Sequence, residues 1–430
     1  MSKEFHIKKL SNGARLLSVP QKNTEAVTIM AIFPVGSRYE NKKINGISHF
    51  IEHLMFKGTA RRPTSFDLTK ELDSMGAEYN AFTSKDHTAY YIKVSRQSAV
   101  KALDLLQDML AHSLFEEKEI EREKGVIVEE INMYTDNPTM VIEEYFEELM
   151  YPGNPLGWYI GGTSEVIKAM TGEDILNYRD QFYKPEKMLL SLAGAVTDEI
   201  MAEAEKMFSI VKTKQTRKIV DSEFKKVDLK NNTSVKERFL LKHKETDQAH
   251  LVAGYPALNY DDERTPAYEI LSSILGGPMS SRLFIAVRER RGLAYIIRSN
   301  TSPYKDVGNF YIQAGLDKNR VDEAIKVILE EIHSFTVTGP TEEEVQRAKD
   351  YLCGRMILAL EDSSAKASWY ARHALLMKHI ETPEERMAKI QKVTAKEIVE
   401  LASEIFKKDQ LRLVVLGPYK DEARFTQLMV

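Results

Sequence analysis

Two distant segments of the chain begin in the same way, and this repeat constrains the fold more than any other feature. The sequence from Phe115 reads FEEKEIEREKGVIVEEINM, and the sequence from Thr341 reads TEEEVQRAKDYLCGRMILAL. In both, acidic residues occupy the first turn of an apolar-periodic helix, where they suit the positive end of the helix dipole. Helix starts share composition, so a chance similarity is the alternative explanation.

The predicted elements around these helices recur in the same order, which favours a duplication over chance. Alternating, β-branched runs predict strands, and apolar residues at helical spacing predict helices. The first half is expected to contain strands at 14–19 and 26–35, a strand pair within 79–94, helices at 47–56, 65–75 and 97–112, and a further helix after Phe115. The second half is expected to contain strands at 238–241, 250–255, 295–301 and 308–315, and helices at 266–275, 283–290 and 321–335.

This order of elements predicts an α+β fold with two tandem homologous domains, each an antiparallel-rich sheet packed by helices. At 430 residues, the chain is also longer than a single hydrophobic core usually supports. We expect the domains to span 1–211 and 235–430, joined by a polar, lysine-rich linker at 212–234.

Composition and charge exclude several classes of protein. Hydrophobic residues make up 43% of the chain and charged residues 29%, which is ordinary for a globular protein. The net charge of -4 argues against nucleic acid as the main partner, because there is no overall basic excess to neutralise phosphates. No apolar run is long enough for a membrane span, the N-terminal stretch lacks the features of a signal or transit peptide, and the single cysteine excludes an internal disulfide. We therefore expect a cytoplasmic protein.

The segment GISHFIEHLMFKGT places two histidines and a carboxylate inside an otherwise apolar helix. His49 and His53 are four residues apart, so both imidazoles can face one ion at the ~2.0–2.1 Å typical of zinc. Glu52 flanks that ion, where a general base for a zinc-activated water belongs. Chance produces such a string in about 0.02 chains of this length, a measure of the motif's false-positive risk. Core histidines held by backbone partners are the alternative, and nothing in the second half corresponds to the motif.

A catalytic zinc needs a third protein ligand, and the helix after Phe115 offers candidates. Glu123 and Glu130 are two helical turns apart and share a face with Val126 and Ile127. A carboxylate on an apolar-flanked face needs a cation or donor to satisfy it. We therefore predict Glu130 as the third ligand, and Glu123 as a partner that either orients a metal-bound histidine or buffers the charge of the site. A half-exposed helix edge is the alternative, and Glu129 is the fallback ligand.

These motifs together resemble one family. The order His-x-x-Glu-His and the spacing from His53 to Glu130 are similar to those of the pitrilysin, insulin-degrading enzyme and mitochondrial processing peptidase family, an inverzincin family. The resemblance spans nearly the whole chain and rests on these segments: GSRYE (36–40), GISHFIEHLMFKGT (46–59), GAEYNAFTSKDHTAYY (76–91), GVIVEEINMYTDNP (125–138) and MSSRLFIAVRERRGLAY (279–295).

The resemblance implies a zinc endopeptidase with one zinc ion per chain. Two-domain halves of this family enclose a chamber like a clamshell, so the expected substrates are unfolded peptides. Chains of this length resemble the processing-peptidase branch. A non-catalytic assembly subunit of the same fold is the main alternative, although such proteins lose residues of the zinc motif. A metal-dependent lyase with a similar string is a weaker one, because its third ligand is a cysteine.

The resemblance also implies residues that contact substrate. Asn80, Ala81 and Phe82 match the family's edge strand, whose backbone would pair with an extended peptide. Arg288 and Tyr295 match the arginine and tyrosine that contact substrate carbonyls and stabilise the oxyanion. In the family these two residues come from the half without zinc. We therefore expect a homodimer in which they complete the zinc site of the other protomer.

Overall fold

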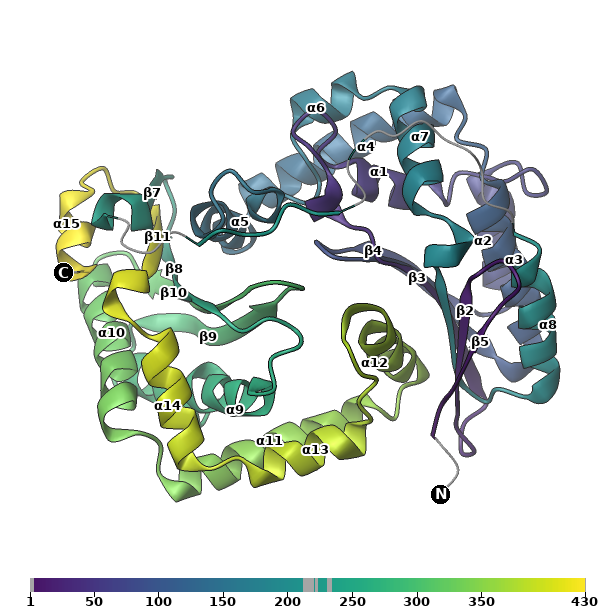
Figure 1. Ribbon diagram of the computed structural model, residues 1–430. Coiled ribbons are helices and arrows are strands. Elements are labelled where there is room, and N and C mark those ends of the chain that lie inside the picture. Colours follow the sequence, from purple (N-terminus) through teal and green to yellow (C-terminus); the bar gives the residue numbers. More distant parts are fainter. Residues whose placement is uncertain (1–3, 212–219, 221–222, 230–233, 430) are drawn as a thin grey trace. The chain divides into compact units, whose positions relative to one another are not determined.

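The computed structural model describes residues 4–211, 220, 223–229 and 234–429 (Figure 1). Most of the predicted linker therefore lies outside the described residues, at 212–219, 221–222 and 230–233. The described chain forms two compact units that are not contiguous in sequence. The first contains the chain up to Asn132 with 158–225 and 358–382, and the second contains the remaining segments, 133–157, 226–357 and the chain from Pro383. The domain boundaries expected from the linear sequence stay a prediction.

The first unit is built on a six-stranded sheet with the order β1-β2-β6-β3-β5-β4. The strands are β1 (His6–Lys9), β2 (Arg15–Pro20), β3 (Ala26–Phe33), β4 (Glu78–Thr83), β5 (Thr88–Ser95) and β6 (Leu189–Gly194). Only β2 and β6 pair in parallel, and every other neighbouring pair is antiparallel. β6 was not predicted, and it separates β2 from β3. β4 lies at the edge of the sheet.

The second unit repeats this arrangement with five strands in the order β7-β11-β8-β10-β9. The strands are β7 (Phe239–His243), β8 (Gln248–Ala257), β9 (Ala294–Pro303), β10 (Gly308–Asp317) and β11 (Arg412–Gly417). Again one pair, β7 with β11, is parallel and the others are antiparallel. The same order and the same single parallel pair confirm two tandem units of mixed helix and antiparallel-rich sheet.

Helices cover both sheets and supply most of the buried apolar side chains. They are α1 (Ile47–Leu54), α2 (Ser65–Ser74), α3 (Ala99–His112), α4 (Glu117–Asp136), α5 (Pro138–Met150), α6 (Ser164–Ala169), α7 (Gly172–Phe182), α8 (Asp198–Ser209), α9 (Thr265–Gly276), α10 (Val321–Thr338), α11 (Glu342–Ala359), α12 (Ser363–Leu376), α13 (Pro383–Lys392), α14 (Ala395–Ile405) and α15 (Ala423–Thr426). Among the residues that the structure describes, no helix is both long and apolar enough to cross a membrane.

Each sheet takes one covering helix from the other half of the sequence. α5 follows the repeated helix α4 and packs on β8 and β11 of the second unit, where the Phe146 ring would lie 2.4 Å from a Cβ at Gly254. α12 follows the repeated helix α11 and packs on β3 and β6 of the first unit (Figure 1). There the hydroxyls of Ser363 and Thr28 lie 2.8 Å apart. Neither half of the sequence therefore contains all the elements of one unit.

Candidate active site

The metal-motif helix α1 begins on a buried carboxylate. Glu40 Oε2 accepts a hydrogen bond from the Gly46 amide at 2.7 Å, and its Oε1 accepts one from the Ser48 amide at 2.9 Å. A negative charge at this end satisfies free amides and suits the helix dipole. Burial raises the pKa of Glu40, and these hydrogen bonds oppose the rise. Gly46 has a φ of 98°, and an added Cβ would lie 2.7 Å from the Gly161 carbonyl, so glycine is required there.

The apolar face of α1 turns the two histidines toward α4. Ile47, Phe50, Ile51 and Leu54 are fully buried in the core of the first unit, which leaves the motif residues on the opposite face. His49 Nε2 and His53 Nε2 lie 3.2 Å apart. Glu130 Oε2 lies 3.7 Å from the first nitrogen and 3.4 Å from the second. The structure therefore brings together the three predicted ligands.

The spacing of these three atoms suits a small tetrahedral cation. Ligands bound at ~2.0–2.1 Å in tetrahedral geometry lie about 3.3 Å from one another. The three distances between His49, His53 and Glu130 scatter around that value. Two imidazole nitrogens and one carboxylate oxygen are also a donor set that zinc accepts. The residues present therefore fit a zinc ion. Glu129, the fallback ligand, is exposed and lies outside this group.

The two histidines differ in their affinity for protons. Burial, followed by the nearby His53, lowers the pKa of His49 to about 4. Burial also disfavours a charged His53, but hydrogen bonds with Glu123 and Glu130 outweigh it and raise the pKa of His53 to about 9. Without metal, the pair therefore carries one positive charge near neutral pH, on His53, where a cation would otherwise compensate the carboxylates.

Glu123 holds His53 in place and is itself held by a lysine. Glu123 Oε1 lies 2.8 Å from His53 Nδ1, so the Nδ1 hydrogen is donated to the carboxylate and Nε2 is left for a metal. Lys57 Nζ forms an ion pair with Glu123 Oε2 at 2.6 Å. The side chain of Glu123 is nearly fully buried, and its contacts with His53 and Lys57 outweigh that burial and lower its pKa. By contrast, His49 Nδ1 is buried without a hydrogen-bond partner among the described residues.

Glu52 lies on α1 beside the ligand group and contacts the edge strand. The Thr83 hydroxyl donates a hydrogen bond to Glu52 Oε2 at 2.6 Å. Burial raises the pKa of Glu52, and the bond from Thr83 opposes that rise. A carboxylate with a raised pKa accepts a proton more readily near neutral pH than an exposed one does.

The edge strand β4 presents only some of its backbone groups to the free side. The Ser84 amide donates to the His87 carbonyl at 2.8 Å, which fixes the alternation of hydrogen-bonded pairs between β4 and β5. By that alternation, the backbones of Asn80 and Phe82 bond to β5. The Ala81 amide instead donates to the Asn80 side chain at 2.9 Å. Of the three residues predicted to pair with a peptide, Ala81 alone has its backbone directed away from β5.

Arg288 and Tyr295 lie together in the second unit. Arg288 is on a π-helical segment (Phe284–Glu289), a helix type that is frequent at functional sites. Its Nη1 donates to the Tyr295 carbonyl at 2.6 Å, and its guanidinium lies 5.1 Å from the Tyr295 ring centre. Tyr295 is the second residue of the edge strand β9 and is 68% exposed. Their part in completing a zinc site stays a prediction.

Comparison with known proteins identifies the family of this chain. Residues 15–164 match the family model described as Insulinase (Peptidase family M16), and residues 169–352 match the model described as Peptidase M16 inactive domain. A Bacillus subtilis protein named "Uncharacterized zinc protease YmxG" is 34% identical over 407 residues, which are 95% of this chain and 97% of that protein. The chain belongs to peptidase family M16.

Other M16 relatives match over similar lengths. A Rickettsia felis protein named "Uncharacterized zinc protease" is 36% identical over 409 residues, which are 94% of this chain and 96% of that protein. A crystal structure described as a protease from Helicobacter pylori has a TM-score of 0.89 and 25% identity, and covers 96% of this chain and 99% of that one. The names of these relatives support a metallopeptidase.

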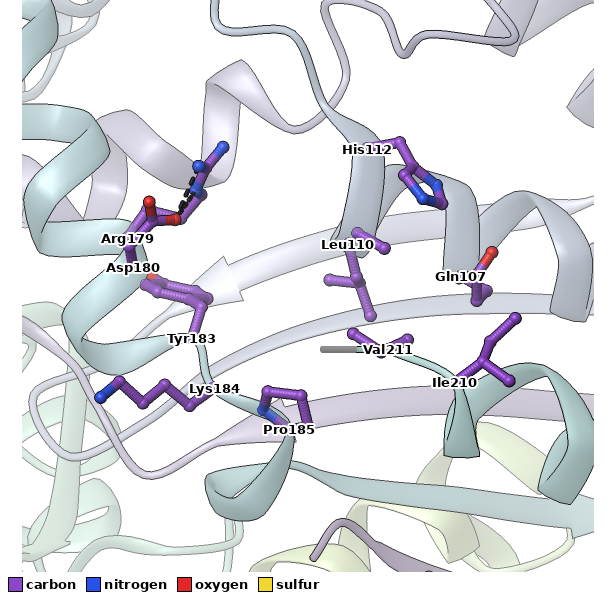
Figure 2. A pocket seen from close by; sticks show the side chains of 11 residues that line it. Gln107, Leu110, His112, Arg179, Asp180, Tyr183, Lys184, Pro185, Ile210 and Val211 are labelled. Carbon is purple, nitrogen blue, oxygen red and sulfur yellow. Dashed lines mark hydrogen bonds and ion pairs between the residues drawn. The ribbon is translucent and has the colours of Figure 1, made fainter. Parts of the chain in front are cut away.

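A separate pocket of about 550 Å³ lies in the first unit of this M16 protein, and its lining differs from the motif residues. Gln107 and His112 of α3, Tyr183, Lys184 and Ile210 are among the residues that line it (Figure 2). Its marked ion pair joins Arg179 to Asp180, which are neighbours in sequence. Among the described residues that line this pocket, no histidines, cysteines or carboxylates gather to hold a metal.

Three residues of the M16 site were not assigned a role from the sequence. Glu40 lies seven residues before the first residue of α1, too far for a sequence pattern to mark it as the helix cap. Lys57 lies three residues after the end of α1, and a lysine there is usually a solvated charge. Thr83 ends a strand, where a hydroxyl can make many different contacts. The roles of Lys57 and Thr83 follow from contacts with residues distant in sequence.

Proposed function

We propose that this M16 chain is a zinc-dependent endopeptidase that cleaves extended, unfolded peptides. One observation carries the proposal: His49, His53 and Glu130 direct three ligand atoms to one point, beside the partly buried Glu52. A zinc ion bound there would polarise the scissile carbonyl and acidify a water molecule. A cytoplasmic location remains part of this proposal.

The residues of the chain then have distinct tasks. Glu52 takes a proton from the attacking water as the oxygen of that water bonds to the carbonyl carbon. The same carboxyl group returns the proton to the amide nitrogen as the carbon–nitrogen bond breaks. Glu123 keeps His53 oriented, and the Ala81 carbonyl accepts a hydrogen bond from the peptide backbone, which gives binding with little dependence on side chains.

The negative charge that develops on the carbonyl oxygen needs further donors. Arg288 and Tyr295 offer a guanidinium and a phenol, which are suited to that charge. We propose that they act in a homodimer, each protomer completing the zinc site of its partner. The two protomers would enclose a chamber that admits peptides and excludes folded proteins.

Zinc content and peptide hydrolysis, measured side by side, test the proposal. A quenched fluorescent peptide should be cleaved by the wild type and not by Glu52→Gln, while both bind one zinc ion per chain. Glu129→Gln is a matched control, because Glu129 is exposed next to Glu130 on the same helix. Wild-type turnover by Glu52→Gln would refute its role. Zinc binding without cleavage of any peptide would favour the alternative, a non-catalytic assembly subunit.

A further inference from the structure

Thr83 connects the proposed proton acceptor to the strand that would hold the substrate. It is the last residue of β4, and its hydroxyl donates to Glu52 Oε2 at 2.6 Å. One short hydrogen bond therefore joins the end of the edge strand to the proposed proton acceptor.

The alternation along β4 shows which edge position lies beside Glu52. Ala81 and Thr83 are the successive residues whose backbones face away from β5, and they are separated by about 7 Å along the strand. A peptide paired at Ala81 would next meet Thr83, where the strand ends. There it would find Glu52, held by the Thr83 hydroxyl.

We propose that Thr83 ends the pairing of a bound peptide with β4 and places Glu52 at the next position, so that cleavage falls at a fixed distance from the residue paired with Ala81. This inference rests on the proposed peptidase function. Pairing through the backbone does not select particular side chains in the peptide. The position of the cleaved bond is then set by the register of the peptide on β4, which Thr83 determines.

The hydroxyl also fixes which carboxylate oxygen is available. Hydrogen bonds to a charged acceptor are short and directional. Thr83 occupies Oε2 of Glu52, which leaves Oε1 free to receive a proton from water. Thr83 is therefore a positioning residue, because it acts through Glu52 and not on the substrate.

Thr83→Val and Thr83→Ser test this role, because the first removes the hydroxyl at nearly constant volume and the second keeps it. Thr83→Val should lower kcat about 10- to 100-fold, the effect of losing a hydrogen bond to a charged group, and leave KM within about threefold. Thr83→Ser should keep most of kcat. Mass spectrometry of the products should show one main cleavage site for wild type and Thr83→Ser, and several neighbouring sites for Thr83→Val.

Two further measurements separate positioning from damage to the fold or the metal site. Zinc content of the Thr83 variants should equal that of the wild type. In the Glu52→Gln background, peptide affinity measured by fluorescence anisotropy should not change with Thr83→Val. If Thr83→Val does not fold, Thr83→Ala replaces it.

Wild-type kcat and an unchanged cleavage site in Thr83→Val would overturn the proposal. Equal losses in Thr83→Ser and Thr83→Val would also overturn it, because a hydroxyl would then not be the cause. Failure of the peptidase function itself looks different, since the wild type would then cleave no peptide.

Discussion

The Lys57 ammonium lies 2.6 Å from Glu123 Oε2, and the other oxygen of that carboxylate lies 2.8 Å from His53 Nδ1. Lys57 therefore acts on a predicted zinc ligand through a nearly fully buried carboxylate. Removing the cation would leave the Glu123 charge buried with one partner, at a cost in free energy.

Lys57→Met should lower zinc affinity about 10- to 100-fold, as is typical for residues that orient metal ligands. Lys57→Arg should retain most of the affinity, because the positive charge remains. Competition with a chromophoric chelator measures both. An affinity of Lys57→Met equal to the wild type would show that the ion pair does not affect the site.

Zinc binding should depend on pH through His53. In the metal-free protein the pKa of His53 is about 9 and that of His49 is about 4, so between pH 5 and 8 the pair carries one positive charge, on His53. Zinc must displace the extra proton of His53, so affinity is greatest above pH 9 and falls about tenfold for each pH unit below it. Calorimetry in buffers of different ionisation enthalpy should find about one proton released per zinc ion. Binding that releases no proton would contradict this.

Mixing two inactive variants should restore activity if the site is shared between protomers. A Glu52→Gln chain supplies an intact Tyr295, and a Tyr295→Phe chain supplies an intact Glu52. Random exchange of subunits makes half of all dimers heterodimers, and each heterodimer has one working site of its two. The mixture should therefore show about a quarter of wild-type activity. Each variant mixed with itself is the control. If subunit exchange is demonstrated and activity still does not recover, a shared site is excluded.

Glu40→Ala should destabilise the first unit, because the amides of Gly46 and Ser48 lose a buried acceptor. We expect a loss of about 2 kcal/mol in the free energy of unfolding, from the lost cap and the unsatisfied amides. Denaturant unfolding measures this change. Glu25→Ala is the matched control: its carboxylate is exposed, so the effect should stay within about 0.5 kcal/mol. Equal effects of the two substitutions would contradict the capping role.

The sequence predicted those parts of the site that depend on local geometry. The histidines are four residues apart on one helix, so their shared face follows from helical periodicity. Glu130 was predicted because a carboxylate beside apolar residues needs a partner, and the structure places it with both histidines. The prediction that Val126 and Ile127 are the apolar residues on that helix face was less accurate. Ile127 is buried, but Val126 is 47% exposed.

The parts that escaped prediction depend on contacts between distant segments. β6 and β11 are short, and their neighbours in the sheets are far away in sequence. α12 contains many small and polar residues, and its apolar pattern is weak because Ala367 and Ala371 suffice to pack it closely on the first sheet. Nothing local marks such a helix as part of a distant unit.

The position of α12 also has a consequence for folding during synthesis. The first sheet is complete once β6 has left the ribosome, but the apolar face formed by Leu17, Met30 and Ile32 is covered by a helix that ends at Leu376. More than a third of the chain must still be translated before that cover exists. The nascent first unit therefore exposes this apolar sheet face until α12 has been synthesised, and a chaperone that binds apolar surface would act at this face.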